Sequence, residues 1–189
     1  MCRTMRPPLE ASDLQVTAAT IRSLLAYAPK SHQTDYRRAV DRAIRWLEQA
    51  EPTSTEDHVF QILGLTWGGG SRETIQKAAS RLLALQRSDG GWGQIPPLVS
   101  DAYATGQALV ALRESGITAP ADQQYQRGVR YLVRSQMEDG SWLVKTRSPS
   151  FQPYFESDFP HGYDQFISAA ASNWAVMALL PAIAIGADH

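Results

Sequence analysis

Four side chains of types that can transfer protons stand out by their position in this sequence. Asp101 and Asp164 each stand at the start of an apolar segment, and Tyr103 follows Asp101 by two residues. His161 lies in a loop, where an imidazole can act as an acid or a base near neutral pH. A lone loop histidine can equally make one structural hydrogen bond. Asp101, Tyr103, His161 and Asp164 are the candidate catalytic residues.

The segment 143–163 is longer than the earlier links between helical segments. A long link in a compact domain is usually functional or disordered, and its aromatic residues argue against disorder. Two interpretations are open. The segment forms a substrate lid or a wall that stabilises cations, together with Lys145 and Arg147, or it packs as a strap over an open end of the fold. The candidate substrate-binding residues are Phe151, Tyr154, Phe155, Phe159 and Tyr163.

These residues need helices to position them. Four apolar segments each begin near an aspartate, and the first three aspartates recur every 44 residues: Asp13, Asp57, Asp101, and then Asp164. Few charges follow within each segment, which is typical of helices buried on most sides. More polar helices are predicted between them, at about 34–50, 73–86 and 122–136. No period-two strand pattern is present, so the fold class is all-α, with inner and outer helices in alternation.

Two stretches share one template at the ends of polar helices. A basic residue, a small residue and a leucine are followed by Gln86, Gly90 and Trp92 in one copy, and by Gln136, Gly140 and Trp142 in the other. The glycines provide turn chemistry, the glutamine amides can bond free helix-end groups, and the indoles can cover the junction. We therefore expect a structural role for these six residues. An earlier copy around Trp46 and Leu47 is degenerate, with no Gly-x-Trp after it.

This template resembles the QW motif of triterpene cyclases and of the related prenyltransferase/squalene-cyclase repeats, which build an α/α toroid. The resemblance implies a partial ring of helix hairpins in a single domain over residues 11–189, with residues 1–10 as a linker or disordered tail. A similar block stands at the C-terminal end of several larger bacterial proteins. The expected partner is the remaining part of a larger toroid or an upstream domain, or a second copy, because open repeat ends seek partners.

The catalytic signatures of these families are incomplete here. Class II cyclases take their acid from a D-x-D-D motif, which this sequence lacks; Glu156 and Asp158 form a loop pair expected to be solvated. Protein prenyltransferases hold zinc with Asp, Cys and His, but Tyr103 and Ile167 occupy the Cys and His positions. We expect no metal and no cofactor, and an apolar, isoprenoid-like ligand if one binds.

Composition sets further bounds. The chain has 189 residues, a net charge of −1 and a sequence pI near 6.4, so no basic surface indicates nucleic acid. Its lone cysteine, Cys2, excludes an internal disulfide. Neither a signal peptide nor a transmembrane segment is predicted, and the location is cytoplasmic if the chain is complete.

Three functions remain open. The first is a squalene-cyclase-like repeat domain, C-terminal in a larger protein, without a complete catalytic motif. The second is a fragment of an isoprenoid cyclase, an isomerase or lyase, whose catalytic acid lies upstream. The third is a protein-interaction module.

Overall fold

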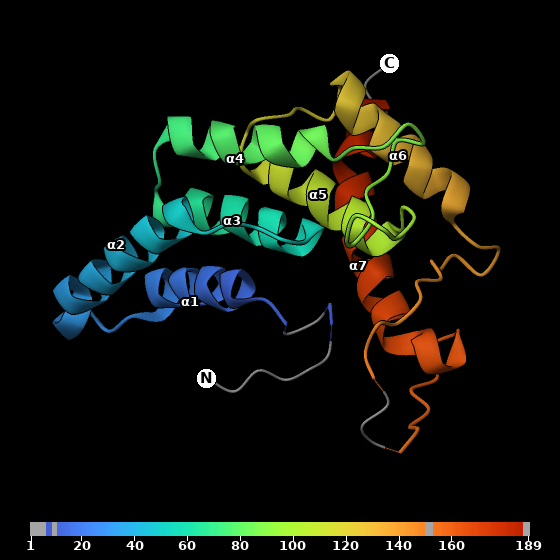
Figure 1. Ribbon diagram of the computed structural model, residues 1–189, viewed down its shortest axis with the longest axis horizontal. Coiled ribbons are helices and arrows are strands. Elements are labelled where there is room, and N and C mark those ends of the chain that lie inside the picture. Colours follow the sequence, from blue (N-terminus) through green and yellow to red (C-terminus); the bar gives the residue numbers. More distant parts are fainter. Residues whose placement is uncertain (1–6, 9–10, 150–152, 187–189) are drawn as a thin grey trace.

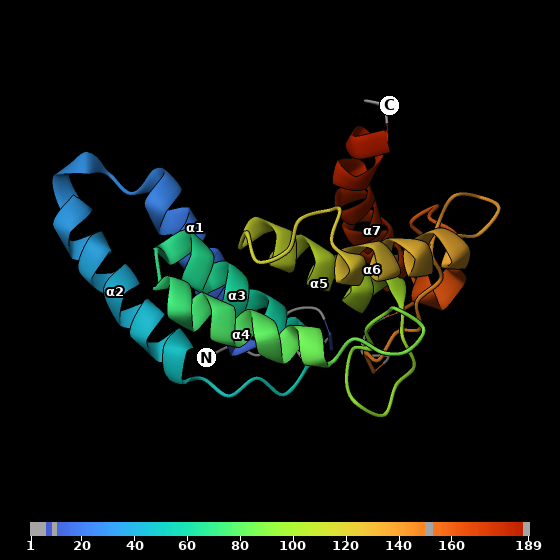
Figure 2. The same cartoon turned by 90° about the horizontal axis from the view of Figure 1, so that it is seen from above.

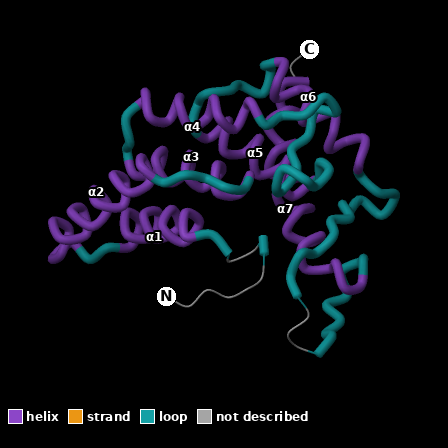
Figure 3. Tube along the Cα trace, viewed as in Figure 1, coloured by secondary structure: helices purple, strands orange, loops and turns teal. Residues whose placement is uncertain are grey.

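The computed structural model describes residues 7–8, 11–149 and 153–186. They form seven α-helices and two short 3₁₀ turns, shown in Figure 1. The helices are α1 (Asp13–Tyr27), α2 (Gln33–Gln49), α3 (Thr55–Gly68), α4 (Arg72–Ala84), α5 (Ala102–Glu114), α6 (Gln123–Ser135) and α7 (Gln165–Gly186). The 3₁₀ turns are η1 (Lys30–His32) and η2 (Gly162–Asp164). The described ranges contain no strand (Figure 3), so the all-α prediction is confirmed.

The helices form two layers. The apolar helices α1, α3, α5 and α7 pack side by side in chain order. The polar helices cover them: α2 contacts α1 and α3, α4 contacts α3, and α6 contacts α5 and α7. Figure 2 shows the hairpins following one another along the molecule. This alternation of inner and outer helices is that of an α/α toroid, here as a partial ring.

Burial of the inner helices depends on their place in the layer. Every residue of α5 from Ala102 to Leu112 is buried, and most of α3 is buried too. The two end helices, by contrast, expose large apolar side chains: Val16 and Leu25 on α1, and Phe166, Val176, Met177 and Leu180 on α7. The expected burial on most sides therefore holds for α3 and α5 only, because α1 and α7 each have an inner neighbour on one side.

The helix starts differ in detail from the aspartate pattern. Ser54, not Asp57, is the N-cap of α3; Asp57 is the third helical residue and completes a capping box with Ser54. Ser12 caps α1, whereas Asp101 itself caps α5 by accepting from the Ala104 amide at 2.9 Å. The repeating aspartates thus all lie at the N-terminal ends of inner helices, but they occupy different positions relative to the N-cap.

Two further expectations concern the N-terminal tail and transmembrane segments. The predicted tail 1–10 lies outside the described residues except for Pro7 and Pro8, and Pro8 is buried. Across the described helices, none combines the length and apolar character needed to span a membrane.

Candidate functional site

The N-terminal ends of α3 and α5 bring three ionisable side chains together inside the protein. Tyr103 is 1% exposed, and Glu56, which the sequence analysis did not single out, is 4% exposed. Burial, helped by the neighbouring Asp57 carboxylate, raises the pKa of Glu56 to about 8, so this carboxyl is neutral at pH 7. Burial also raises the pKa of Asp101. The only sequence signal for Glu56 is an acid in the first turn of a helix that is apolar on most sides.

Gln94 joins three parts of this end of the ring. Its side-chain amide donates to Asp101 Oδ2 at 3.0 Å and accepts from Arg147 Nε at 2.7 Å. Its backbone carbonyl accepts from the Thr55 amide at 3.0 Å. The starts of α3 and α5 and the long segment 143–163 are therefore tied to one buried glutamine.

Asp164 lies at a separate point, just before α7. Its carboxylate accepts from Lys145 Nζ and from the Thr146 amide, both at 2.8 Å. These two hydrogen bonds hold the start of the segment 143–163 against the residue that follows its end. The structure thus brings Asp101 and Tyr103 together, and it assigns Asp164 a positioning contact with a lysine.

His161 belongs to a chain of hydrogen bonds with Ser141 and Asp139, in the turn that follows α6. Its Nε2 lies 2.7 Å from Ser141 Oγ, and that hydroxyl lies 2.6 Å from Asp139 Oδ1. Hydrogen bonds from Ser141 lower the pKa of Asp139, so its carboxylate is an acceptor only. The single hydroxyl hydrogen therefore goes to Asp139, and His161 must donate from Nε2. This geometry makes the imidazole a donor to Ser141 and not the base that would activate it.

The loop aromatics lie on the surface. Tyr154, Phe155 and Tyr163 are 46%, 67% and 75% exposed, and Phe159 is half-buried. The Tyr154 and Tyr163 rings are 4.7 Å apart between centroids. Phe151 lies outside the described residues. Glu156 and Asp158 are exposed, as expected for a solvated pair.

The two template copies have matching geometry. Trp92 Nε1 donates to the Leu82 carbonyl at 2.8 Å, and Trp142 Nε1 donates to the Leu132 carbonyl at 2.9 Å. Both indoles are buried, and both carbonyls belong to the last turns of an outer helix. Each tryptophan therefore ties an outer helix to the link that follows it.

We expected the glutamine amides to bond free groups at the helix ends, but both bond a carbonyl within the turn. Gln86 Nε2 donates to the carbonyl of Gly90, and Gln136 Nε2 to that of Gly140, each at 2.9 Å. These glycines have φ of 92° and 83°, a conformation that side-chain-bearing residues rarely adopt. The glutamines thus close the turns, and the indoles serve the helix-end carbonyls.

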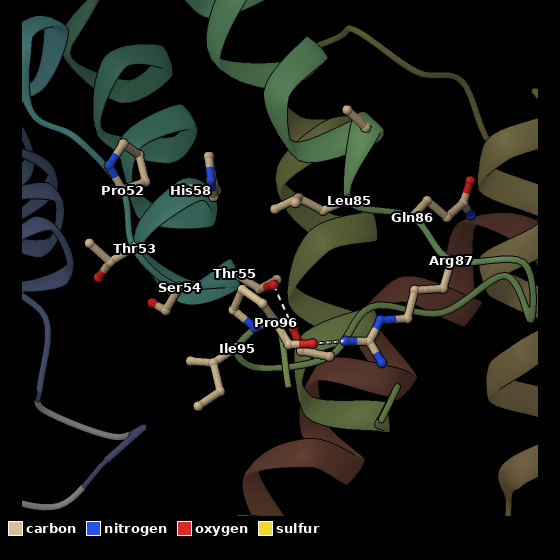
Figure 4. Close-up of a pocket in the computed structure, with 12 residues that line it drawn as sticks. Pro52, Thr53, Ser54, Thr55, His58, Leu85, Gln86, Arg87, Ile95 and Pro96 are labelled. Atoms are coloured by element: carbon tan, nitrogen blue, oxygen red, sulfur yellow. Dashed lines mark hydrogen bonds between the residues drawn. The ribbon is translucent and has the colours of Figure 1, made fainter. Parts of the chain in front are cut away.

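A pocket of about 450 Å³ opens beside the start of α3 (Figure 4). It is lined by Pro52, His58, Leu85, Arg87, Ile95 and Pro96, among others, and by none of the four candidate catalytic residues. The link 50–54 is much shorter than the link 85–101 and has no turn to fill this space. Two donors at its edge are already used, because Thr55 Oγ1 bonds the Gly93 carbonyl and Arg87 bonds the Pro96 carbonyl. His58 Nδ1, by contrast, is buried without a hydrogen-bond partner among the described residues.

The chemistry of the buried carboxyls limits what they can do. Protonation of an alkene needs an unusually strong acid, whereas burial makes Glu56 and Asp101 weaker acids than free carboxylic acids. Asp57 has a lowered pKa because hydrogen bonds from Ser12, Thr53 and Ser54 outweigh its burial, but these bonds belong to the helix cap. Among the described residues, no group of three or more His, Cys, Asp or Glu is placed to hold a metal ion.

No protein-family model matches the chain. Three curated proteins are similar to parts of it. Squalene–hopene cyclase of Bradyrhizobium diazoefficiens is 34% identical over 111 residues, 49% of this chain and 15% of that protein. Protostadienol synthase A of Arthroderma gypseum is 32% identical over 114 residues, 52% of this chain and 15% of that protein. Drimenyl diphosphate synthase of Streptantibioticus cattleyicolor is 30% identical over 155 residues, 69% of this chain and 27% of that protein.

These partial similarities support a terpene cyclase-like family for the chain, in agreement with its helical layers. The matches span between 15% and 27% of the length of these relatives.

Proposed function

We propose that this chain is a squalene-cyclase/prenyltransferase-like repeat domain, the C-terminal part of a larger protein, which supplies one side of an α/α toroid. It carries no complete catalytic motif of its own. Its inner helices form part of the wall of an apolar cavity that accepts an isoprenoid-like ligand, and the remaining wall comes from the rest of the toroid or an upstream domain.

The unequal burial of the inner helices carries this proposal. The central helices α3 and α5 are covered on all sides, but α7 exposes Val176, Met177 and Leu180. No charged residue occurs anywhere in α7, a helix of 22 residues. Several large apolar side chains exposed together on an uncharged helix mark a contact surface, so the free side of α7 calls for a further helical partner. The greater length of the relatives gives the same indication.

The direct test is the mass of the native protein. An antibody raised against residues 34–50 should detect a polypeptide well above the 20.9 kDa of this chain, and its reading frame should contain further helical repeats. A native protein of 20.9 kDa would overturn the proposal, and self-association would then have to cover α7.

The same parent protein separates the two other functions. An isoprenoid cyclase would carry a D-x-D-D motif upstream, and incubation with squalene and related isoprenoids would give a new cyclic product. The buried carboxyls here have raised pKa values, so the acid would have to come from that upstream part. An interaction module would bind a protein through the free apolar edge and give no lipid product.

A further inference from the structure

The pocket beside the start of α3 lies where the first repeat lacks a turn. When the two template copies are aligned, Ala84 at the end of α4 corresponds to Arg134 at the end of α6. Arg134 donates to the Asp89 carbonyl at 3.0 Å, so the turn after α4 packs against this part of α6. The link 50–54 after α2 is too short for such a turn, and Ala84 instead lines a pocket of about 450 Å³ (Figure 4). The chain therefore leaves open at its first junction a space that it fills at the second.

Apolar side chains from three parts of the chain form the walls of this pocket. Pro52 comes from the link before α3, Leu85 from the end of α4, and Ile95 and Pro96 from the link before α5. The pocket volume lies within the range of about 300–1,000 Å³ that is usual for small-molecule sites. Its described lining belongs to α3, α4 and the links beside them, and not to the exposed faces of α1 and α7. The pocket is therefore separate from the surfaces on which the proposed function depends.

The charge of the lining is positive. Arg87 is the one charged residue among the described lining residues, which include no aspartate or glutamate. Its Nη2 donates to the Pro96 carbonyl at 2.9 Å, which fixes the guanidinium in place, and no described group bonds its Nε or Nη1. A held guanidinium with unused N–H groups is a good partner for a carboxylate. A phosphate monoester, with a charge of about −1.5 to −2, would exceed the single positive charge.

The other side of the pocket is uncharged. Figure 4 shows His58, on α3, and Arg87 on different sides of the lining residues. Burial lowers the pKa of His58, so its imidazole is neutral at pH 7. The wall that His58 shares with Pro52 thus suits the apolar part of a ligand, whereas the Arg87 side suits its charged end.

We propose that this pocket binds a small carboxylic acid with an apolar body, whose carboxylate accepts from Arg87 and whose body packs against Pro52, Leu85 and Ile95. The next junction has a similar contact, since the Asp89 carbonyl oxygen accepts from Arg134. The site goes beyond the proposed function and does not depend on it, because no part of the ring cavity is involved.

The first experiment varies the charge of the ligand. The isotope-labelled full chain is titrated at pH 7 with naphthoate, naphthylmethanol and naphthylmethylamine, which share one ring system, and amide chemical shifts are recorded by NMR. Naphthoate should bind about tenfold or more tightly than the other two, as expected for a charge-assisted hydrogen bond. The largest shifts should occur at Thr55, His58 and Gly93, which line the pocket. Equal affinities, or largest shifts far from these residues, would overturn the proposal.

The second experiment varies the pocket. Arg87→Met removes the charge and keeps an unbranched side chain, so it should abolish the preference for naphthoate. Arg81→Met is the matched control, because Arg81 is a neighbouring arginine on α4 that pairs with Glu51 at 3.8 Å and is not part of the described lining. It should retain the preference. An equal loss in both variants would indicate a long-range charge effect and contradict the site.

A third variant tests the cavity without changing any charge. Ala84 is exposed and lines the pocket, so Ala84→Phe should keep the fold, fill the space and weaken binding of naphthoate about tenfold or more. This variant retains Arg87 and decides the question if Arg87→Met does not fold. Unchanged affinity for naphthoate in correctly folded Ala84→Phe would show that the ligand binds elsewhere.

Discussion

The side-chain amide of Gln61 donates to the Leu47 carbonyl at 2.7 Å. Leu47 corresponds to Leu82 and Leu132 in the later repeats, where indole N–H groups from Trp92 and Trp142 donate to the same carbonyl position. The first repeat has no tryptophan at this junction, and an amide from the next inner helix replaces the indole. The helix-end carbonyl is therefore satisfied in all three repeats by two different residue types.

This replacement predicts a specific cost for losing Gln61. Gln61→Leu keeps an apolar side chain of similar size but leaves the carbonyls of Leu47 and Ala50 without this donor. We expect a loss of about 2 kcal/mol in the free energy of unfolding, measured by urea denaturation. The exposed Gln49→Leu, at the end of α2, should change it by less than about 0.5 kcal/mol. Equal effects of the two variants would show that the amide has no special role.

Removal of the third junction should lower stability and leave ligand binding to correctly folded protein unaffected. Trp142→Ala deletes a buried ring and its hydrogen bond, and should cost about 3–5 kcal/mol. Gln136→Ala removes an exposed side chain that closes one turn, and should cost about 1 kcal/mol or less. Thermal melting measures both. Unchanged melting together with loss of a ligand would contradict the structural role.

The buried carboxyl of Glu56 predicts a loss of stability as pH rises from about 4.5 to about 8. Its pKa is about 8 in the folded protein and 4.5 as a reference for the unfolded chain, so the folded state holds this proton more tightly. Its contribution is fully present below pH 4.5 and is lost as pH rises towards 8, with a slope of at most about 1.4 kcal/mol per pH unit. Glu56→Gln should flatten the profile between pH 5 and 8. An unchanged slope in this variant would show that another group is responsible.

The contact between α5 and α7 depends on a close backbone approach at Gly106. A Cβ at this position would lie 2.7 Å from the backbone carbon of Trp174 and 2.8 Å from the Ala175 nitrogen. The helices would have to separate, so Gly106→Ala should cost about 2–3 kcal/mol in chemical denaturation. Gly128→Ala is the matched control on α6, because the three atoms nearest to its Cβ all belong to the side chain of Leu109 and none to the backbone. A cost for Gly128→Ala as large as that for Gly106→Ala would argue against the backbone explanation.

The sequence by itself determined the helical layers and the turns. The alternation of apolar and polar helices and the Gly-x-Trp turns are local patterns, since helical periodicity and turn chemistry depend on near neighbours in the chain. Asp101 and Tyr103 were also found from the sequence, because each stands early on an apolar helix.

Tertiary structure alone decided which groups meet and which are buried. Glu56 on α3 lies beside Tyr103 on α5, and Gln94 accepts a hydrogen bond from Arg147, which is distant in the sequence. Gln61 replaces a tryptophan through a contact that no local pattern encodes. Tyr154, Phe155 and Tyr163 are exposed, although the sequence allowed either a ligand wall or a packed strap for their segment. Burial and hydrogen bonding between distant segments depend on how helices pack, and they set the pKa values of the carboxyl groups in the candidate site.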